Sequence, residues 1–228
     1  MSAARPPEGA KAPLGGSDPR AAGERGGPVS PLIHLIDDDA AVRESLALLI
    51  GTVGLRVQAW ADPQAFLADF EGDAIGAIVL DVRMPGINGL TLLDTLMAQG
   101  VDQPIIMLTG HATVEMCRRA LKSGAMEFLE KPVNDELLLE ALQAAVRQHV
   151  RSRERLGADR AARERHAQLS PREREVLGLI VEGLTNKQIG RALGLSPRTV
   201  ESHRARLFDK LEVDSLAQLI RRYAALVE

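Results

Sequence analysis

The stretch PLIHLIDDDAAVRESLALLI (residues 31–50) places three acidic residues directly after a short apolar run. Residues 31–36 have the pattern of a buried strand, and the aliphatic residues between 42 and 50 recur at helical spacing. Adjacent carboxylates raise one another's cost of ionisation, so three in a row need a compensating charge. The stretch therefore predicts a strand, an acidic turn and a helix, with a cation near the turn.

The same alternation of strand and helix continues to about residue 150. Apolar runs predict four further strands at residues 55–60, 74–80, 104–110 and 125–130. A segment with helical spacing or helix-favouring composition follows each strand. Five strand–helix units in roughly 120 residues predict an α/β fold, a doubly wound five-stranded parallel sheet with helices on both faces.

Charge divides the chain into two halves with opposite signs. Residues 30–149 hold 8 Lys or Arg and 17 Asp or Glu, whereas residues 150–228 hold 16 and 11. The basic half would tolerate a polyanion and the acidic half would not. The basic half also predicts four helices with a helix-turn-helix pattern, and therefore a smaller all-α domain. Its predicted N-caps include Ser170, Ser196 and Asp214.

Composition predicts four segments along the chain. Residues 1–30 are rich in Pro, Gly and Ala and predict a disordered tail. The α/β domain follows over residues 31–150, and the all-α domain occupies residues 167–228. Between them, residues 151–166 are rich in Arg, Glu and Ala and predict a linker, either helical or flexible. Gly157 argues against one unbroken helix there.

Several classes of protein are disfavoured by composition. A single cysteine, Cys117, excludes an intrachain disulfide. No apolar run reaches the roughly 18 residues that a membrane span needs. The N-terminus lacks the apolar core of a secretory signal. These features predict a cytoplasmic protein without a membrane partner.

Polar side chains stand at the ends of four predicted strands. Asp37 and Asp38 follow the first strand, Asp81 the third, Thr109 the fourth and Lys131 the fifth. In an open parallel sheet, ligands bind beyond the carboxyl ends of the strands. Three acids indicate a hard cation such as Mg²⁺, while a lysine and a hydroxyl indicate an anion that carries oxygens. The set predicts phosphoryl transfer onto an aspartate.

Four motifs in this order resemble the receiver domain of bacterial two-component response regulators. They are IDDD (36–39), DVRMPGINGL (81–90), LTGHA (108–112) and EKP (130–132). The resemblance covers about residues 31–150, and residues 108–132 look most like the FixJ-type subgroup. It implies that a sensor histidine kinase phosphorylates Asp81.

The resemblance to receivers also implies roles for other residues. The implied metal ligands are Asp37, Asp38, Asp81 and the main-chain carbonyl of Arg83. Thr109 and Lys131 would contact the phosphoryl oxygens, and Thr109 and Phe128 would change position on activation. Asp39 is predicted to cap the first helix rather than to bind metal.

Residues 166–228 resemble the LuxR-type DNA-binding domain. The motifs are REREVL (172–177), EGLTNKQIGRALGLS (182–196) and TVESHRARLFDKL (199–211). The resemblance implies binding to promoter DNA, with the helix that starts near Pro197 in the major groove. The predicted DNA contacts are Lys187, Arg198, Thr199, Ser202, His203, Arg206 and Lys210. Glu201 either accepts a hydrogen bond from cytosine or points away from the DNA.

The final helix is predicted to mediate dimerisation of the DNA-binding domain. Its apolar residues are Leu216, Leu219, Ile220, Tyr223 and Leu226. A dimer implies inverted DNA half-sites about one helical turn apart.

Three functions are compatible with these motifs. The favoured one is a transcriptional response regulator that is not an enzyme. After phosphorylation it would form a homodimer, bind double-stranded promoter DNA and work with RNA polymerase. A phosphatase or mutase that forms an aspartyl-phosphate usually has a second acid two residues after the nucleophile, where this chain has Arg83. A phosphate-independent regulator with a degenerate receiver would lack Asp81 or Lys131.

Overall fold

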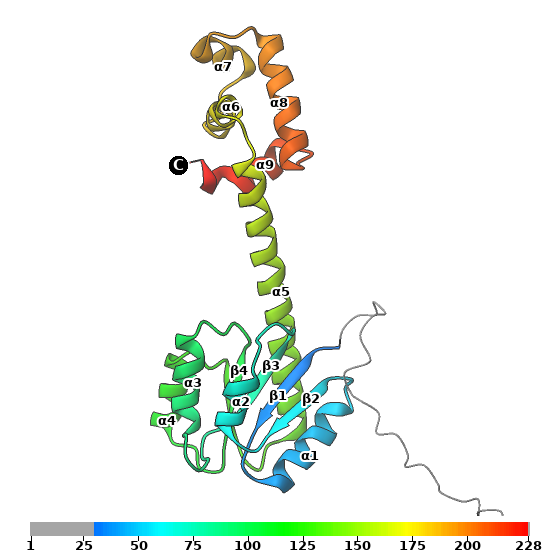
Figure 1. Cartoon of the computed structure of the whole chain (residues 1–228), viewed down its shortest axis with the longest axis vertical. Helices are drawn as coiled ribbons and strands as arrows, with labels where there is room; N and C mark the ends of the chain where they lie inside the picture. The colour runs from blue at the N-terminus through cyan, green and yellow to red at the C-terminus, as the bar shows by residue number, and fades with distance from the viewer. Residues whose placement is uncertain (1–29, 228) are drawn as a thin grey trace, which may run out of the picture. The chain divides into compact units, whose positions relative to one another are not determined.

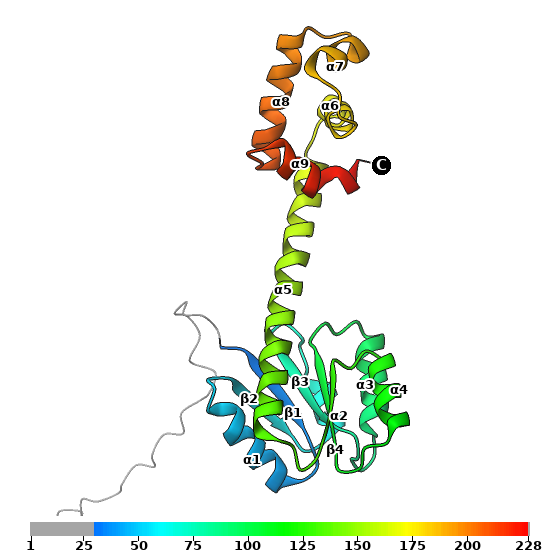
Figure 2. The same ribbon diagram turned by 180° about the vertical axis from the view of Figure 1, so that it is seen from behind.

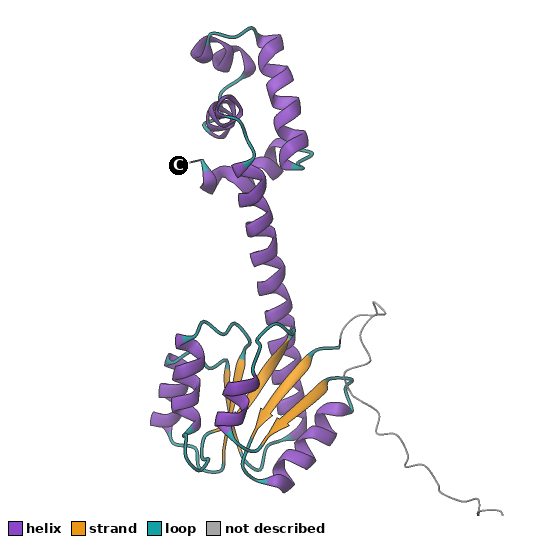
Figure 3. Cartoon of the chain, viewed as in Figure 1, coloured by secondary structure: helices purple, strands orange, loops and turns teal. Residues whose placement is uncertain are grey.

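The computed structural model describes residues 30–227, which begin with an α/β domain (Figures 1 and 3). Its strands are β1 (Leu32–Ile36), β2 (Arg56–Trp60), β3 (Gly76–Asp81), β4 (Ile105–Thr109) and β5 (Glu127–Glu130). Its helices are α1 (Ala40–Gly51), α2 (Pro63–Asp69), α3 (Gly89–Ala98), α4 (Val114–Lys122) and α5 (Asp135–Ala167). The predicted α/β fold is confirmed. The tail predicted for residues 1–30 lies outside the described residues except for Ser30.

All five strands are parallel, in the order β2-β1-β3-β4-β5. Strands β1 and β3 are therefore neighbours at the point where the order reverses, which is where ligands bind in such sheets. Ile36 pairs with Leu80 in the β1–β3 register. This pairing brings the acids that follow β1 close to Asp81, although more than 40 positions separate them in the sequence.

Two apolar cores lie on opposite faces of the sheet (Figure 2). Helices α1 and α5 cover one core, and α2, α3 and α4 cover the other. Strand β3 contributes to both, because Ala77 and Val79 face the first core while Ile78 and Leu80 face the second. All six residues of β3 are buried, as its continuous apolar run predicts.

Helix α5 runs without a break through the predicted linker and is 33 residues long. The expectation that Gly157 would interrupt it is wrong. The segment around Gly157 is rich in Ala, Arg and Glu, which favour helix. Two exposed ion pairs at i,i+4 spacing, Arg155–Asp159 and Arg160–Glu164, add further local support. Together they offset the cost of one glycine.

The remaining helices form the all-α domain. They are α6 (Pro171–Val181), α7 (Asn186–Leu193), α8 (Pro197–Leu211), α9 (Leu216–Tyr223) and the 3₁₀ turn η1 (Ala224–Leu226). Val176, Ile189, Val200 and Leu207 are fully buried in its core. Ala162 of α5 also belongs to this core, so the last turns of α5 are part of the domain. No helix within residues 30–227 is both long and apolar enough to cross a bilayer.

Most helix starts follow the predicted capping chemistry. Asp39, Ser170 and Ser196 each accept a hydrogen bond from a main-chain N–H in the first turn of the helix that follows. The prediction for the last helix is wrong by one residue, because Ser215 caps α9 by accepting from the N–H of Gln218. The N–H of Asp214 instead donates to the side chain of Gln218.

We expect Gly76→Ala to destabilise the α/β domain. A Cβ at position 76 would lie 1.7 Å from the carbonyl oxygen of Leu32 in the neighbouring strand. The substitution should lower the free energy of unfolding by about 2–4 kcal/mol, measured by urea denaturation. Gly51→Ala is the matched control, since nothing lies within 4 Å of its Cβ position. An unchanged urea midpoint for Gly76→Ala would contradict the expected clash.

Candidate functional site

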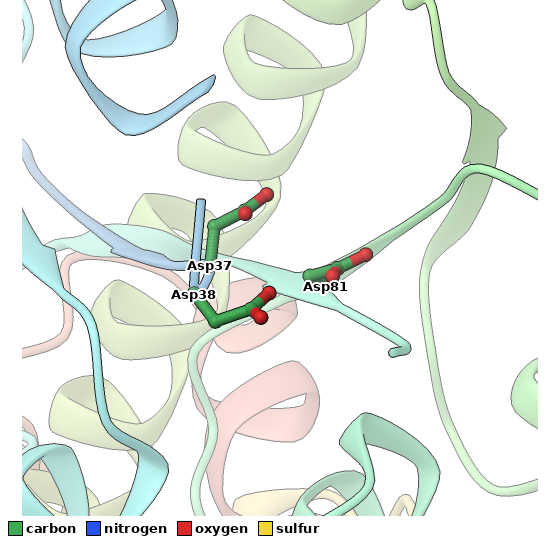
Figure 4. A group of neighbouring side chains, drawn as sticks. All are labelled: Asp37, Asp38 and Asp81. Atoms are coloured by element: carbon green, nitrogen blue, oxygen red, sulfur yellow. The ribbon is translucent and has the colours of Figure 1, made fainter. Parts of the chain in front are cut away.

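Three carboxylates meet at the edge of the sheet where β1 and β3 end (Figure 4). Asp37 and Asp38 come from the turn after β1, and Asp81 is the last residue of β3. One carboxylate oxygen from each lies within 4.8 Å of the other two. Asp37 and Asp81 are buried, whereas Asp38 is exposed. The predicted acidic cluster is therefore formed, with one member open to solvent.

Lys131, which follows β5, reaches into this acidic cluster. Its Nζ lies 2.5 Å from Oδ2 of Asp37 and 3.2 Å from Oδ1 of Asp81. Burial alone would lower the pKa of Lys131, but its hydrogen bond to Asp37 and the charges of both aspartates raise the pKa above its ordinary value. The lysine is therefore held as a cation between two buried carboxylates.

Asp81 remains incompletely satisfied despite this lysine. Burial raises the pKa of Asp81, and the positive charge of Lys131 only partly opposes this effect. The Oδ1 atom of Asp81 is buried and forms an ion pair with Nζ of Lys131 at 3.2 Å, but no donor among residues 30–227 meets normal hydrogen-bond geometry at this atom. Three carboxylates facing one ammonium leave an excess of negative charge. Hard oxygen donors in this arrangement fit a metal ion.

The loop after β3 brings main-chain atoms close to Asp81. The carboxylate of Asp81 accepts a hydrogen bond from the main chain of Arg83, whose side chain is exposed. A Cβ on Gly89, the first residue of α3, would lie 2.0 Å from the carbonyl oxygen of Asp81. Only glycine fits there. Gly89 is not among the predicted site residues, and its place in the DVRMPGINGL motif is the sequence signal for it.

Thr109 and Phe128 lie on the neighbouring strands β4 and β5, and no hydrogen bond within residues 30–227 joins either side chain to the acidic cluster. The buried hydroxyl of Thr109 accepts from the N–H of His111 at 3.2 Å and donates to its carbonyl at 3.3 Å. Glu130 holds the same loop by accepting from the N–H of Ala112 at 3.2 Å. Phe128 is half-buried. The hydroxyl of Thr109 therefore supports the β4–α4 loop in this state.

An apolar groove lies between β5 and α4. Phe128 lines it together with Val114, Cys117 and Leu121. Val114 is 87% exposed and Leu121 is 46% exposed, so two large aliphatic side chains face solvent beside this groove. The groove and these two side chains together give the receiver an exposed apolar surface at α4 and β5.

The start of α8 presents most of the predicted DNA contacts. The exposed residues among them are Lys187 on α7 and Arg198, Thr199, Ser202 and Arg206 on α8, while His203 is half-buried. The turn between α7 and α8 needs Gly194, which adopts a left-handed φ of 68°. A Cβ on the buried Gly190 would lie 2.7 Å from the carbonyl of Leu195. These two glycines let the helix-turn-helix close tightly.

Lys210 differs from the other predicted DNA contacts. Its Nζ lies 2.8 Å from Oε2 of the buried Glu173, so it joins α8 to α6. Glu173 also accepts from the N–H of Ser170 at 2.8 Å and from its hydroxyl at 2.9 Å. The hydrogen bond from Lys210 lowers the pKa of Glu173 to about 2. Lys210 therefore has an internal ion-pair partner while its side chain stays 45% exposed, and its phosphate contact stays a prediction.

The five apolar residues predicted for the final helix differ in burial. Leu226 lies outside α9, in η1, where it is half-buried against the core of the domain. Leu219 and Tyr223 are fully buried in the core of their own domain, and the hydroxyl of Tyr223 donates to the carbonyl of Leu211 at 2.8 Å. Leu216 is 44% exposed and Ile220 is 40% exposed. Only this second pair offers a large apolar surface for the dimerisation predicted for this helix.

Comparison with known families agrees with both parts of the structure. Residues 33–143 match the response regulator receiver domain, and residues 167–223 match the bacterial regulatory proteins of the luxR family. The chain belongs to the DNA-binding transcriptional response regulators of two-component systems. In this class a receiver is paired with a histidine kinase and a LuxR-type domain binds DNA.

Individual relatives extend over most of the chain. The transcriptional regulatory protein FixJ of Bradyrhizobium diazoefficiens is 44% identical over 83% of this chain and 92% of its own length. The regulatory protein DctR of Rhodobacter capsulatus, named for C4-dicarboxylate transport, is 40% identical over 83% of this chain and 97% of its own. The structure of the response regulator StyR has a TM-score of 0.76 at 35% identity, covering 86% of this chain and all of its own.

We expect Glu173→Gln to destabilise the all-α domain by about 1–3 kcal/mol at pH 7, because Lys210 loses a charged partner. The folded-state pKa of Glu173, about 2, is below its ordinary value of 4.5. Its contribution is therefore fully present above pH 4.5 and is lost as the pH falls through about 2. Thermal unfolding against pH should show the difference from wild type shrinking below pH 4.5.

Glu175→Gln is the control for this experiment. Glu175 lies on the same helix and forms an exposed ion pair with Arg172. Exposed pairs of this kind contribute little, so its variant should unfold like the wild type. If both glutamine variants behave alike, the ion pair of Glu173 with Lys210 has no special role in stability.

Proposed function

We propose that Asp81 is the phosphoacceptor through which a sensor histidine kinase controls DNA binding by this chain. The observation that carries the proposal is the buried Oδ1 of Asp81, which forms an ion pair with Nζ of Lys131 at 3.2 Å and accepts no hydrogen bond of normal geometry among the described residues. A carboxylate held in this way can attack phosphorus, and the ammonium can receive the oxygens that arrive. The family membership of the chain supports the same assignment.

The group that fits the acidic cluster is Mg²⁺. Asp37, Asp38, Asp81 and the main-chain carbonyl of Arg83 would hold it, with the exposed Asp38 the most available carboxylate because Lys131 already occupies Asp37. When bound, Mg²⁺ offsets negative charge on the transferring phosphoryl group.

The reaction itself needs little from the protein besides positioning. A carboxylate oxygen of Asp81 attacks the phosphorus of a phosphohistidine on the kinase. The new O–P bond forms as the N–P bond breaks, and the imidazole nitrogen keeps the electron pair of that bond. Lys131 then pairs with the phosphoryl oxygens, which bring about −1.5 to −2 charges. No separate substrate is turned over, so we do not assign enzymatic activity to the chain.

Phosphorylation would change the β4–α4 loop through Thr109. To donate to a phosphoryl oxygen, its hydroxyl has to give up the hydrogen bond that it donates to the carbonyl of His111. The loop that these contacts support then moves, and Phe128 beside it changes position. The groove that Phe128 lines would present Val114 and Leu121 in a new arrangement. We propose that this surface joins two phosphorylated receivers into a homodimer.

The homodimer would bind promoter DNA with two copies of α8. Arg198, Thr199, Ser202, His203 and Arg206 would face the major groove, with Lys187 on a phosphate. Leu216 and Ile220 would supply the contact between the two DNA-binding domains. The two half-sites are expected to lie about one helical turn apart. We place the protein in the cytoplasm, where promoter DNA and RNA polymerase are accessible to it.

Asp81→Asn tests the proposed phosphoacceptor. Acetyl phosphate with Mg²⁺ should add one phosphoryl group to the wild type, seen by intact mass, and should increase its dimerisation and its affinity for promoter DNA. The variant should gain none of the three, because an amide is not a nucleophile of this kind. Chelation of divalent ions should abolish the same gains in the wild type.

Asp94→Asn provides the matched control for the phosphoacceptor. Asp94 is exposed, lies on α3 and pairs with Arg119. Its variant should take up the phosphoryl group as the wild type does. Phosphorylation of Asp81→Asn to the wild-type level would contradict the assignment.

Lys187→Ala and Lys210→Met separate DNA contact from domain stability. Loss of Lys187 should weaken binding to all sequences and reduce the slope of log K against log salt by about 1 per bound subunit. Lys210→Met should lower the thermal stability of the all-α domain and leave this slope unchanged, since its charge is paired with Glu173. Gel-shift titrations at several salt concentrations measure both. A smaller salt slope for Lys210→Met than for the wild type would show that Lys210 also contacts DNA.

A further inference from the structure

A second buried polar cluster lies at the opposite end of β3 from Asp81. His149, on α5, is fully buried and lies beyond residue 143, where the receiver family match ends. Its Nδ1 is 3.1 Å from both the main-chain nitrogen and the main-chain oxygen of Gly76, the first residue of β3. The proposed phosphorylation mechanism makes no use of this histidine.

Arg153, one turn further along α5, completes the cluster. Its Nε donates to Nε2 of His149 at 3.2 Å and lies 2.7 Å from Oδ2 of Asp102. Its Nη2 donates to Oδ1 of Asp102 at 3.0 Å and to the carbonyl of Gly72 at 2.6 Å. An imidazole protonated at Nδ1 can donate to Gly76 while its Nε2 accepts from Arg153.

The cluster joins α5 to three separate parts of the receiver. Gly76 begins β3, Gly72 lies in the loop before it, and Asp102 lies in the loop before β4. Donation from one guanidinium to a carboxylate, a carbonyl and an imidazole constrains the arginine more than a single exposed ion pair would. Helix α5 is therefore fastened to the receiver as far as Arg153.

Tertiary support for α5 stops directly after this cluster. Residues 154–160 are all exposed, and burial resumes at Ala162 in the core of the all-α domain. Gly157 lies at the centre of the exposed stretch, and a Cβ there would meet nothing within 4 Å. Glycine is the least favourable residue for a helix interior apart from proline. No side chain of these seven residues is buried, and Ala158 and Asp159 only line an open pocket beside Arg221 and Arg222 of α9.

We propose that His149, Arg153 and Asp102 form a clamp that makes α5 part of the receiver up to Arg153. Because the clamp ends there, bending of the interdomain helix is confined to residues 154–160, with Gly157 as the pivot. The position of the pivot is then set by the clamp and not by the end of the receiver's apolar core. This inference concerns the helix alone and does not depend on which residue accepts the phosphoryl group.

Amide hydrogen exchange of the full-length chain tests the clamp. Residues 146–153 should be protected, and residues 154–160 should exchange at least about tenfold faster. Arg153→Met and Asp102→Asn should each raise exchange over residues 146–153 by about tenfold, because each removes a charged hydrogen-bond partner. Asp102→Asn keeps the shape of the side chain, so it preserves the test if the other variant fails to fold. Strand β4 serves as the internal reference.

Two control variants sharpen the result. Arg151→Met removes an exposed arginine from the same turn of α5 that the cluster does not use, and it should leave exchange unchanged. Gly157→Ala should slow exchange over residues 154–160 by about fivefold, because alanine is the better helix former.

Three outcomes would overturn the proposal. Unchanged protection of residues 146–153 from amide exchange in Asp102→Asn or Arg153→Met would contradict the proposed clamp. An equal loss of protection in Arg151→Met would show that any arginine on this turn matters equally. Exchange over residues 154–160 as slow as over residues 146–153, or indifferent to Gly157→Ala, would remove the pivot.

Discussion

The contact of Lys131 with Asp37 and Asp81 is the interaction on which the proposed chemistry depends. It occurs where three acids would otherwise repel one another at the edge of a parallel sheet. One ammonium cannot neutralise three carboxylates, so the site keeps an affinity for a cation while remaining compatible with folding. In the proposed mechanism the same lysine would pair with the phosphoryl oxygens on Asp81. One side chain would then stabilise the unphosphorylated site and bind the phosphoryl group.

Charged groups also organise the DNA-binding half, but with the opposite consequence. There the buried Glu173 is satisfied by Ser170 and Lys210, and no excess charge remains. A satisfied buried carboxylate fixes two helices relative to one another. Asp81 has only the ion pair with Lys131 at its buried Oδ1, and this difference in hydrogen bonding supports the proposal that Asp81 is the reactive acid.

Much of the architecture was predictable from local pattern. The alternation of strand and helix, the burial of β3 on both faces and the N-caps at Asp39, Ser170 and Ser196 follow from side-chain periodicity and capping chemistry. The unbroken course of α5 past Gly157 did not follow, because many weak helix-favouring terms outweigh one unfavourable residue. The N-cap of α9 was misplaced by one residue because adjacent Asp214 and Ser215 are both good caps.

The sequence by itself determined which residue types stand at each strand end, and therefore that acids, a hydroxyl and a lysine share one edge of the sheet. It could do so because parallel strands all end on the same side. Only the tertiary structure decided which of these groups are paired. The ion pair of Lys210 with Glu173 could not be read from the sequence, and Gly89 gained importance only from its closeness to Asp81. Burial and pairing depend on contacts between segments that are distant in sequence. Local side-chain periodicity does not specify which of these segments come into contact.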